Sequence, residues 1–127
     1  SNPRAFGIAK IDEDGKLSDL IERPRLEEVK GFEDNGFYLA NSGPLVFKPE
    51  VFDYIEKTSP SPNGEYWITD TIRIMLREGC PALGYRIPRD VFWRDVGTPV
   101  ARLEAEEYAL RNMKNFNKGS KRHERKV

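Results

Sequence analysis

The sequence predicts an α/β layered fold, because segments with strand character alternate along it with segments of helical periodicity. The clearest strand signal is an Asp-Gly turn that separates two apolar runs near the start of the chain. The clearest helix signals are stretches that follow a proline or a threonine and repeat apolar residues every three or four positions. The length of 127 residues suits one domain.

The chain is predicted to begin with a β-hairpin. Residues 6–11 predict a strand, and the turn at 12–15 leads into a return strand over 16–23. This strand ends at Pro24, which has no backbone N–H to donate to a sheet. The charged stretch 25–36 predicts a loop with room for one helical turn.

A second extended region and a short helix are expected next. Residues 37–47 fit either two strands or one strand bent at Gly43. Pro49 favours a helix start, and the turn-rich stretch 59–64 predicts a loop after that helix. The apolar stripe of this helix consists of Val51, Phe52 and Ile55.

Two further helices are expected, with extended segments between them. The first begins with Thr69 or Asp70 as its N-cap and stops at Gly79. Strand character follows over 82–87 and again at Phe92-Trp93. The last helix begins at Thr98, with Pro99 in its first turn. The apolar faces of these helices are Ile72, Met75 and Leu76 in the first, and Val100, Leu103, Tyr108, Leu110 and Met113 in the last.

Charge and composition narrow the class of protein. The formal net charge is zero, from 21 basic and 21 acidic residues, so nothing favours nucleic acid or an anionic membrane as a partner. The single cysteine, Cys80, cannot form a disulfide within the chain and fits a reducing cytosol, so we expect a cytoplasmic location. Residues 117–127 carry five basic residues and one acidic residue. A solvated, disordered tail explains them better than an arm for nucleic acid, membrane or an acidic partner.

Several kinds of chemistry have no support in the sequence. It contains no glycine-rich phosphate loop, no HExxH, no CxxC pair and no GxSxG. The single histidine, His123, lies in the basic tail and offers no base for a nucleophilic triad. Chemistry would therefore depend on carboxylates, basic side chains, backbone amides and a hard metal ion.

Three groups of residues could supply such chemistry. Glu22 and Arg23 end a strand; this pair suits sugar hydroxyls and a phosphate, although it also serves as a plain edge terminator. Asn41 and Gly43 interrupt an apolar stretch, either as a bulge or as a place where a ligand approaches the backbone. Asp95 follows the bulky Trp93 and precedes a helix, where a carboxylate could hold Mg²⁺ through one oxygen or could be structural.

Five motifs in order resemble those of the sugar-1-phosphate nucleotidyltransferases, over roughly residues 3–112. They are FGIAKIDEDG, IERP, NSGPLVF, GEYWITD and FWRDVGTP. The resemblance implies a Rossmann-like mixed sheet and a magnesium-dependent reaction of an NTP with a sugar 1-phosphate to give an NDP-sugar and pyrophosphate. It also implies that residues 1–116 are the C-terminal, sugar-binding portion of that domain, lacking the half that holds the triphosphate.

The same resemblance implies roles for individual residues. Glu22 would bind sugar hydroxyls and Arg23 the sugar phosphate. Asn41 and Gly43 would line the sugar pocket beside Trp93. Asp95 would be one of two magnesium-binding aspartates.

The sequence departs from the family pattern in ways that keep a second function open. Arg23 stands where the family usually has lysine, and Trp67 where it often has a second acidic residue. These departures would suit a non-catalytic sugar-phosphate-binding or regulatory subunit. Ser1-Asn2 resembles the scar of a protease cleavage, so we expect a piece of a longer enzyme that is inactive alone. An incomplete sheet would leave an open edge, so we also expect self-association.

Overall fold

The computed structural model describes residues 3–120, with side chains through Asn112. The chain forms two compact units, Ser1–Ile87 and Pro88–Val127. The first unit contains a small sheet, two short 3-10 helices and two α-helices. In chain order these are η1 (Pro3–Ala5), β1 (Gly7–Ile11), β2 (Leu17–Glu22), η2 (Leu26–Val29), β3 (Leu39–Ala40), α1 (Val51–Glu56) and α2 (Ile68–Arg77).

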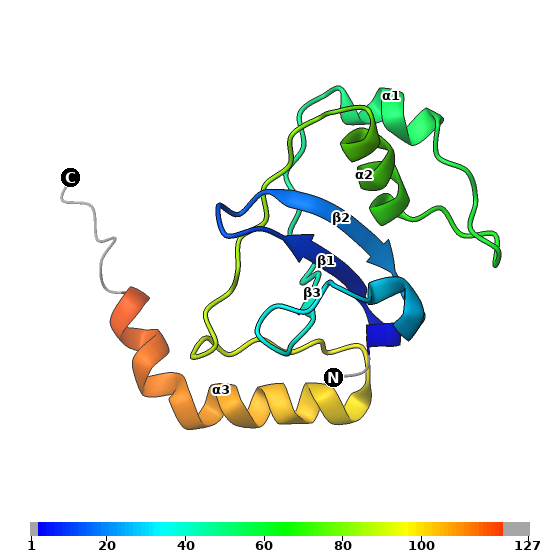
Figure 1. Ribbon diagram of the computed structural model, residues 1–127. Helices are drawn as coiled ribbons and strands as arrows, with labels where there is room; N and C mark the ends of the chain where they lie inside the picture. Colours follow the sequence, from blue (N-terminus) through cyan, green and yellow to red (C-terminus); the bar gives the residue numbers. More distant parts are fainter. Residues whose placement is uncertain (1–2, 121–127) are drawn as a thin grey trace. The chain divides into compact units, whose positions relative to one another are not determined.

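The sheet has the strand order β2-β1-β3, and both of its pairings are antiparallel (Figure 1). The predicted hairpin is confirmed: the Asp12 N–H donates to the Lys16 carbonyl at 3.0 Å, and Gly15 adopts a φ of +83° that favours glycine. An α/β fold is therefore present in the first unit. The mixed, Rossmann-like sheet implied by the family resemblance stays a prediction.

A β-bulge at Ser18 adjusts the hairpin to its core. Lys10 pairs with Asp19, but the next residue, Ile11, pairs with Leu17, so Ser18 is an extra residue in β2. The Ser18 hydroxyl donates to the Lys10 carbonyl at 3.1 Å and closes the bulge. Because of the bulge, Leu17 joins the core on the same side as Leu20, although three positions separate them.

The sheet is covered on both faces. On one face Ala9, Leu17 and Leu20 pack with Ile72 of α2. On the other face Ile8 packs with Val29, at the end of η2, and with Phe32. Figure 1 shows α2 beside the β1–β2 hairpin and α1 next to α2.

Polar contacts join the two helices to each other and to the sheet. The Arg73 Nε donates to Asp19 Oδ1 at 2.9 Å and ties α2 to β2. The Thr58 and Thr71 hydroxyls lie 2.8 Å apart, and both side chains are buried. The Thr58 hydroxyl donates its proton to the Tyr54 carbonyl at 2.9 Å, so Thr71 must be the donor between the two threonines.

The helix boundaries correct some of the sequence-based expectations. α2 begins at Ile68, one residue before the expected cap, and Trp67 occupies the N-cap position without a side-chain cap bond. Gly79, with a φ of +85°, does follow the end of α2 as predicted. In α1 only Val51 of the expected apolar stripe is buried, whereas Phe52 and Ile55 are exposed.

Two extended segments are also shorter than expected. Residues 82–87 form no strand; one isolated bridge joins Leu83 to Lys16, and the Arg86 guanidinium donates to the Ile11 and Asp12 carbonyls, each at 2.9 Å. Of residues 37–47 only Leu39–Ala40 joins the sheet, as β3. In both segments a few backbone hydrogen bonds to one neighbouring strand replace the continuous hydrogen-bond ladder of a longer strand.

The second unit contains α3 (Pro99–Ser120), a helix of 22 residues. The Thr98 hydroxyl accepts the Ala101 N–H at 3.2 Å, which confirms the predicted N-cap. The expected apolar face is largely exposed, with Val100, Leu103 and Leu110 at 65–70%. α3 includes residues 117–120 of the expected basic tail, whereas 121–127 and the Met113 side chain lie outside the described part of the chain. Across the described residues, no helix combines the length and apolar character needed to cross a membrane.

Thr71→Val tests the buried threonine pair. It removes the hydrogen that Thr71 donates to Thr58 while it keeps the shape of the side chain. We expect the free energy of unfolding to fall by about 1 kcal/mol, as for the loss of a buried hydrogen bond. Urea denaturation measures this change, with Thr71→Ser, which retains the hydroxyl, as the control. An unchanged midpoint for Thr71→Val would contradict the assignment.

Candidate functional site

A cluster of polar side chains surrounds the first residue of β1. Gly7 pairs with Glu22, the last residue of β2, and its carbonyl accepts the Asn41 N–H at 2.7 Å. Thr69, in the first turn of α2, completes the cluster: a Cβ built on Gly7 would lie 3.3 Å from its methyl carbon. We call Gly7, Glu22, Asn41 and Thr69 the Gly7 cluster.

The missing side chain of Gly7 allows the Glu22 carboxylate to approach the backbone of β1. A Cβ at this position would stand 2.9 Å from Glu22 Oε2, closer than real Cβ atoms come to a neighbour, and 3.5 Å from the Asn41 Cβ. The Glu22 carboxylate therefore lies directly against the β1 backbone, with its side chain only 20% exposed. Glycine here provides close approach, and no unusual backbone conformation is involved.

Thr69 carries a hydroxyl without a partner. Its side chain is 2% exposed, and Oγ1 makes no hydrogen bond in the part of the chain that the structure describes. Buried hydroxyls normally have a partner, because an unsatisfied one costs about 1–3 kcal/mol. A polar atom of this kind beside a glutamate and an asparagine is suited to bind a hydroxyl-rich ligand.

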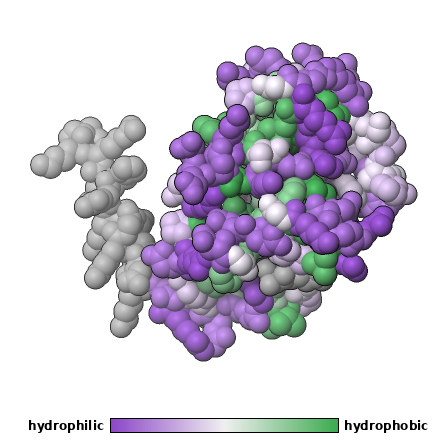
Figure 2. Space-filling view, viewed as in Figure 1, coloured by the Kyte–Doolittle hydropathy of each residue, from purple (hydrophilic) through white to green (hydrophobic). Residues whose placement is uncertain are grey.

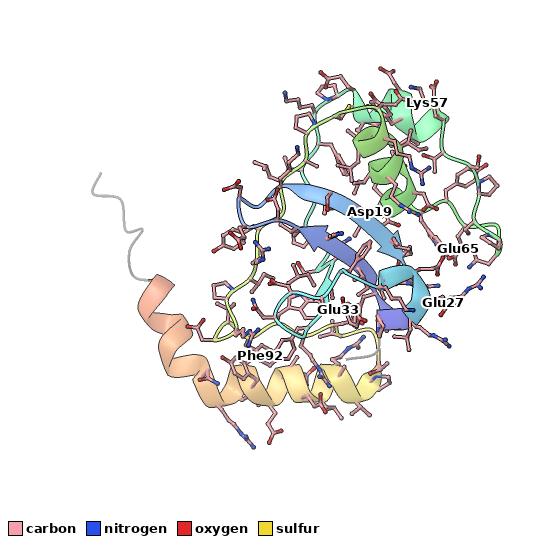
Figure 3. The ribbon with its side chains drawn as sticks, in the orientation of Figure 1. Asp19, Glu27, Glu33, Lys57, Glu65 and Phe92 are labelled. Carbon is pink, nitrogen blue, oxygen red and sulfur yellow. The ribbon has the colours of Figure 1, made fainter. Side chains whose placement is uncertain are left out.

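Arg23 lies at the edge of the cluster, in an unusual backbone conformation. Its φ of +42° falls in the left-handed region, which side chains other than glycine rarely adopt. Its guanidinium has carboxylates on two sides, with Nε 3.9 Å from Glu22 Oε1 and Nη1 3.8 Å from Glu65 Oε2. Figure 3 shows Glu65 beside the end of β2, the strand that Arg23 follows. Strain of this kind is concentrated at ligand-binding positions.

The predicted pair Asn41 and Gly43 forms a tight local turn. The Gly43 N–H donates to Asn41 Oδ1 at 3.2 Å, and Gly43 has a φ of +102°. This bond uses the oxygen of the Asn41 amide and leaves its Nδ2 hydrogens for a ligand. The turn breaks the extended segment, as one of the two interpretations predicts, while the role of Asn41 and Gly43 in binding a ligand stays a prediction.

The other predicted site residues, Trp93 and Asp95, belong to the second unit. Asp95 is exposed, and its Oδ1 accepts the Gly97 N–H at 3.0 Å just before α3. The ring of Phe92, labelled in Figure 3, stacks on Tyr108 of α3 with centroids 3.7 Å apart. An ion pair between Arg94 and Glu104 adds a second link to the helix. These two contacts fix the segment that carries Asp95, whereas Trp93 is 41% exposed.

The carboxylates of the described residues bear on where a metal ion could be held. Within residues 3–120, no three His, Cys, Asp or Glu side chains gather in a group that could hold a metal ion by themselves. Asp95 has one carboxylate oxygen engaged by a backbone N–H and the other open, which fits a single ligand bond to Mg²⁺.

Sequence reasoning missed two members of the Gly7 cluster. Gly7 is part of the first family motif, but no local pattern shows that three other segments approach it closely. Thr69 is expected from the sequence to cap a helix, and that role gives no indication that its hydroxyl is buried without a partner.

Comparison with known proteins identifies the family. A sequence model described as nucleotidyl transferase matches residues 1–112. The chain belongs to the nucleotidyltransferase family. Among its relatives, a low-salt glycan biosynthesis nucleotidyltransferase of Haloferax volcanii is 37% identical over 94% of this chain and 30% of its own length. A bifunctional GlmU protein of Methanocaldococcus jannaschii is 33% identical over 93% of this chain and 26% of its own length.

A third relative is named for the sugar phosphates on which it acts. It is a bifunctional sugar-1-phosphate nucleotidylyltransferase/acetyltransferase of Sulfurisphaera tokodaii, 28% identical over 89% of this chain and 25% of its own length. The chain therefore spans between 25% and 30% of the length of these three relatives. The family resemblance found in the sequence is confirmed.

Thr69→Val tests whether the Thr69 hydroxyl lacks a structural partner. Because the hydroxyl is buried without a partner, its removal should leave the free energy of unfolding unchanged or raise it by about 1 kcal/mol. The matched control is Thr71→Val, the same substitution two residues along α2, for which we expect the opposite sign. Urea denaturation of both variants gives the comparison. Equal destabilisation by the two would mean that the Thr69 hydroxyl has a structural partner.

Proposed function

We propose that this chain is the sugar-binding and metal-contributing part of an enzyme that transfers a nucleotidyl group from an NTP to a sugar 1-phosphate. The products would be an NDP-sugar and pyrophosphate, which places the enzyme in nucleotide-sugar biosynthesis. The observation that carries the proposal is the Gly7 cluster with Arg23 at its edge, in a chain of the nucleotidyltransferase family. A carboxylate, an amide and an unpartnered hydroxyl suit sugar hydroxyls, and a guanidinium suits the phosphate.

The residues of the first unit would bind and align the sugar phosphate. Glu22, Asn41 and Thr69 would hold its hydroxyl groups, and Arg23 would neutralise its phosphate. A phosphate oxygen would attack the α-phosphorus of the nucleotide in line, forming the new P–O bond as the bond to pyrophosphate breaks. Such a transfer depends on alignment and charge neutralisation, so it requires no nucleophilic side chain.

Asp95 is the residue that would hold Mg²⁺, through the carboxylate oxygen that the Gly97 N–H leaves open. Bound magnesium would supply charge neutralisation for the phosphates. One aspartate is too few for a complete site, so further ligands would come from substrate phosphates, water and other parts of the enzyme. The short loop before the Thr98 cap, fixed by the contacts of Phe92 and Arg94 to α3, would keep this carboxylate in place.

The proposed activity is tested with the longest chain that the gene encodes. Pyrophosphate release is measured for each combination of an NTP and a sugar 1-phosphate in the presence of Mg²⁺. We expect Asp95→Ala to lower kcat by at least about a hundredfold, because it would remove a metal ligand. Asp90→Ala, at an exposed carboxylate five residues earlier, is the matched control and should keep full activity. The 127-residue chain itself should be inactive.

The outcomes separate the proposal from its rival. Turnover that collapses in Asp95→Ala but survives in Asp90→Ala supports the enzyme. Binding of sugar phosphate without turnover for any pair of substrates would instead favour the non-catalytic binding or regulatory subunit. Pyrophosphate release by the intact 127-residue chain would contradict its proposed dependence on a further nucleotide-binding part.

Self-association is a further part of the proposal. Val46, Leu83 and Tyr85 are 82–99% exposed in the first unit, and Figure 2 shows hydrophobic residues at the surface between hydrophilic ones. Exposed apolar side chains and open strand edges favour association. We expect light scattering of the 127-residue chain to give a dimer or larger species at high concentration, and a monomer there would contradict the expectation.

A further inference from the structure

Three contacts converge on the Arg23 guanidinium. Besides the two carboxylates at 3.8 and 3.9 Å, the Trp67 ring lies under it, with the ring centroid 6.0 Å from Cζ. The contacts come from the end of β2, from the loop before α2 and from the N-cap position of α2. The three contacts thus reach the guanidinium from different parts of the first unit.

Glu65 is itself fixed by Trp67. The indole Nε1–H donates to Glu65 Oε2 at 2.8 Å, the same oxygen that faces Arg23 Nη1. This hydrogen bond is the main cause of the lowered pKa of Glu65, with smaller contributions from Asn63 and from the charge of Arg23. The carboxylate therefore stays ionised at neutral pH and can support the guanidinium.

The stability gained from a surface ion pair does not account for this set of contacts around Arg23. The Arg23 and Glu65 side chains are each about half exposed, and an isolated pair at 3.8 Å would contribute little to stability. A long arginine side chain loses conformational entropy when it binds a ligand. Contacts that order the side chain before binding reduce this cost and raise the affinity for the ligand. In the described part of the chain the two carboxylates face Nε and Nη1, and no carboxylate pairs with Nη2. That amino group is available to a phosphate.

We propose that Glu65 and Trp67 are positioning residues, which hold the Arg23 guanidinium ready for the phosphate of the sugar phosphate. The inference rests on the proposed function and adds to it the two residues that orient the phosphate-binding group. It also gives Trp67 and Arg23 a common explanation: a planar guanidinium can lie on an indole ring and face two carboxylates, whereas a lysine ammonium lacks that planar fork. The two departures from the family pattern act as one unit.

The binding test uses glucose 1-phosphate as the probe and the full 127-residue chain, with affinity measured by NMR titration. Glu65→Gln removes the charge, and Trp67→Phe removes the N–H but keeps an aromatic ring. Each should weaken glucose 1-phosphate binding by about tenfold, the effect of losing about one charge-assisted contact. In an Arg23→Ala background both effects should vanish, because no guanidinium remains to be positioned.

The matched control is Glu27→Gln. Glu27 is an exposed glutamate that pairs with the neighbouring Arg25 at 3.9 Å, so it reports the effect of removing a surface carboxylate of this kind (Figure 3). It should leave glucose 1-phosphate binding unchanged. Losses in Glu65→Gln and Trp67→Phe that persist in the Arg23→Ala background would overturn the inference, since they would reflect a general structural effect.

A second readout needs no ligand. The NMR order parameter of the Arg23 Nε–H bond should exceed that of Arg25, whose side chain is 75% exposed, and should fall in Glu65→Gln and in Trp67→Phe. An unchanged order parameter overturns the positioning role. A fall in the order parameter in a chain that binds no glucose 1-phosphate would support the positioning role and count against the proposed function.

Discussion

The close approach of three segments to the backbone of Gly7 is the constraint on which the candidate site depends. The ends of β2 and β3 bond to the start of β1, and the first turn of α2 lies against the same residue. Any side chain at Gly7 would push the Glu22 carboxylate away, since the space for a Cβ is already filled. The same hydrogen bonds that form the sheet therefore also gather the polar groups of the site.

Local signals in the sequence were sufficient for much of this fold. The Asp-Gly turn gave the hairpin, Gly79 the end of α2 and Thr98 the start of α3, because each acts through the conformation or hydrogen bonding of its own backbone. The bulge in β2 is different, because it depends on the pairing between two strands. Because the sheet is covered on both faces, the spacing of Leu17 and Leu20 alone does not call for a bulge; the two residues share one core cluster because the pairing with β1 shifts at Ser18.

The remaining features depend on tertiary contacts that no local pattern encodes. Residues 82–87 have strand character, but their pairing with the hairpin is one isolated bridge at Leu83. Glu22, Arg23 and Asn41 were expected to act together, and the structure does bring them together. Thr69 and Glu65 were missed because their importance comes from burial without a partner and from a bond to Trp67, respectively. Residues of this kind become visible only when the segments are assembled.

The contacts of Trp67 have a consequence for optical spectroscopy. The chain contains two tryptophans, Trp67 and Trp93, and the emission of an indole responds to hydrogen bonding of its N–H and to nearby charge. Trp67 has both, through Glu65 and Arg23. Its fluorescence therefore reports directly on the group proposed to bind phosphate, without any label. With Trp93 replaced by phenylalanine, the protein would carry a single tryptophan, at the edge of its candidate site.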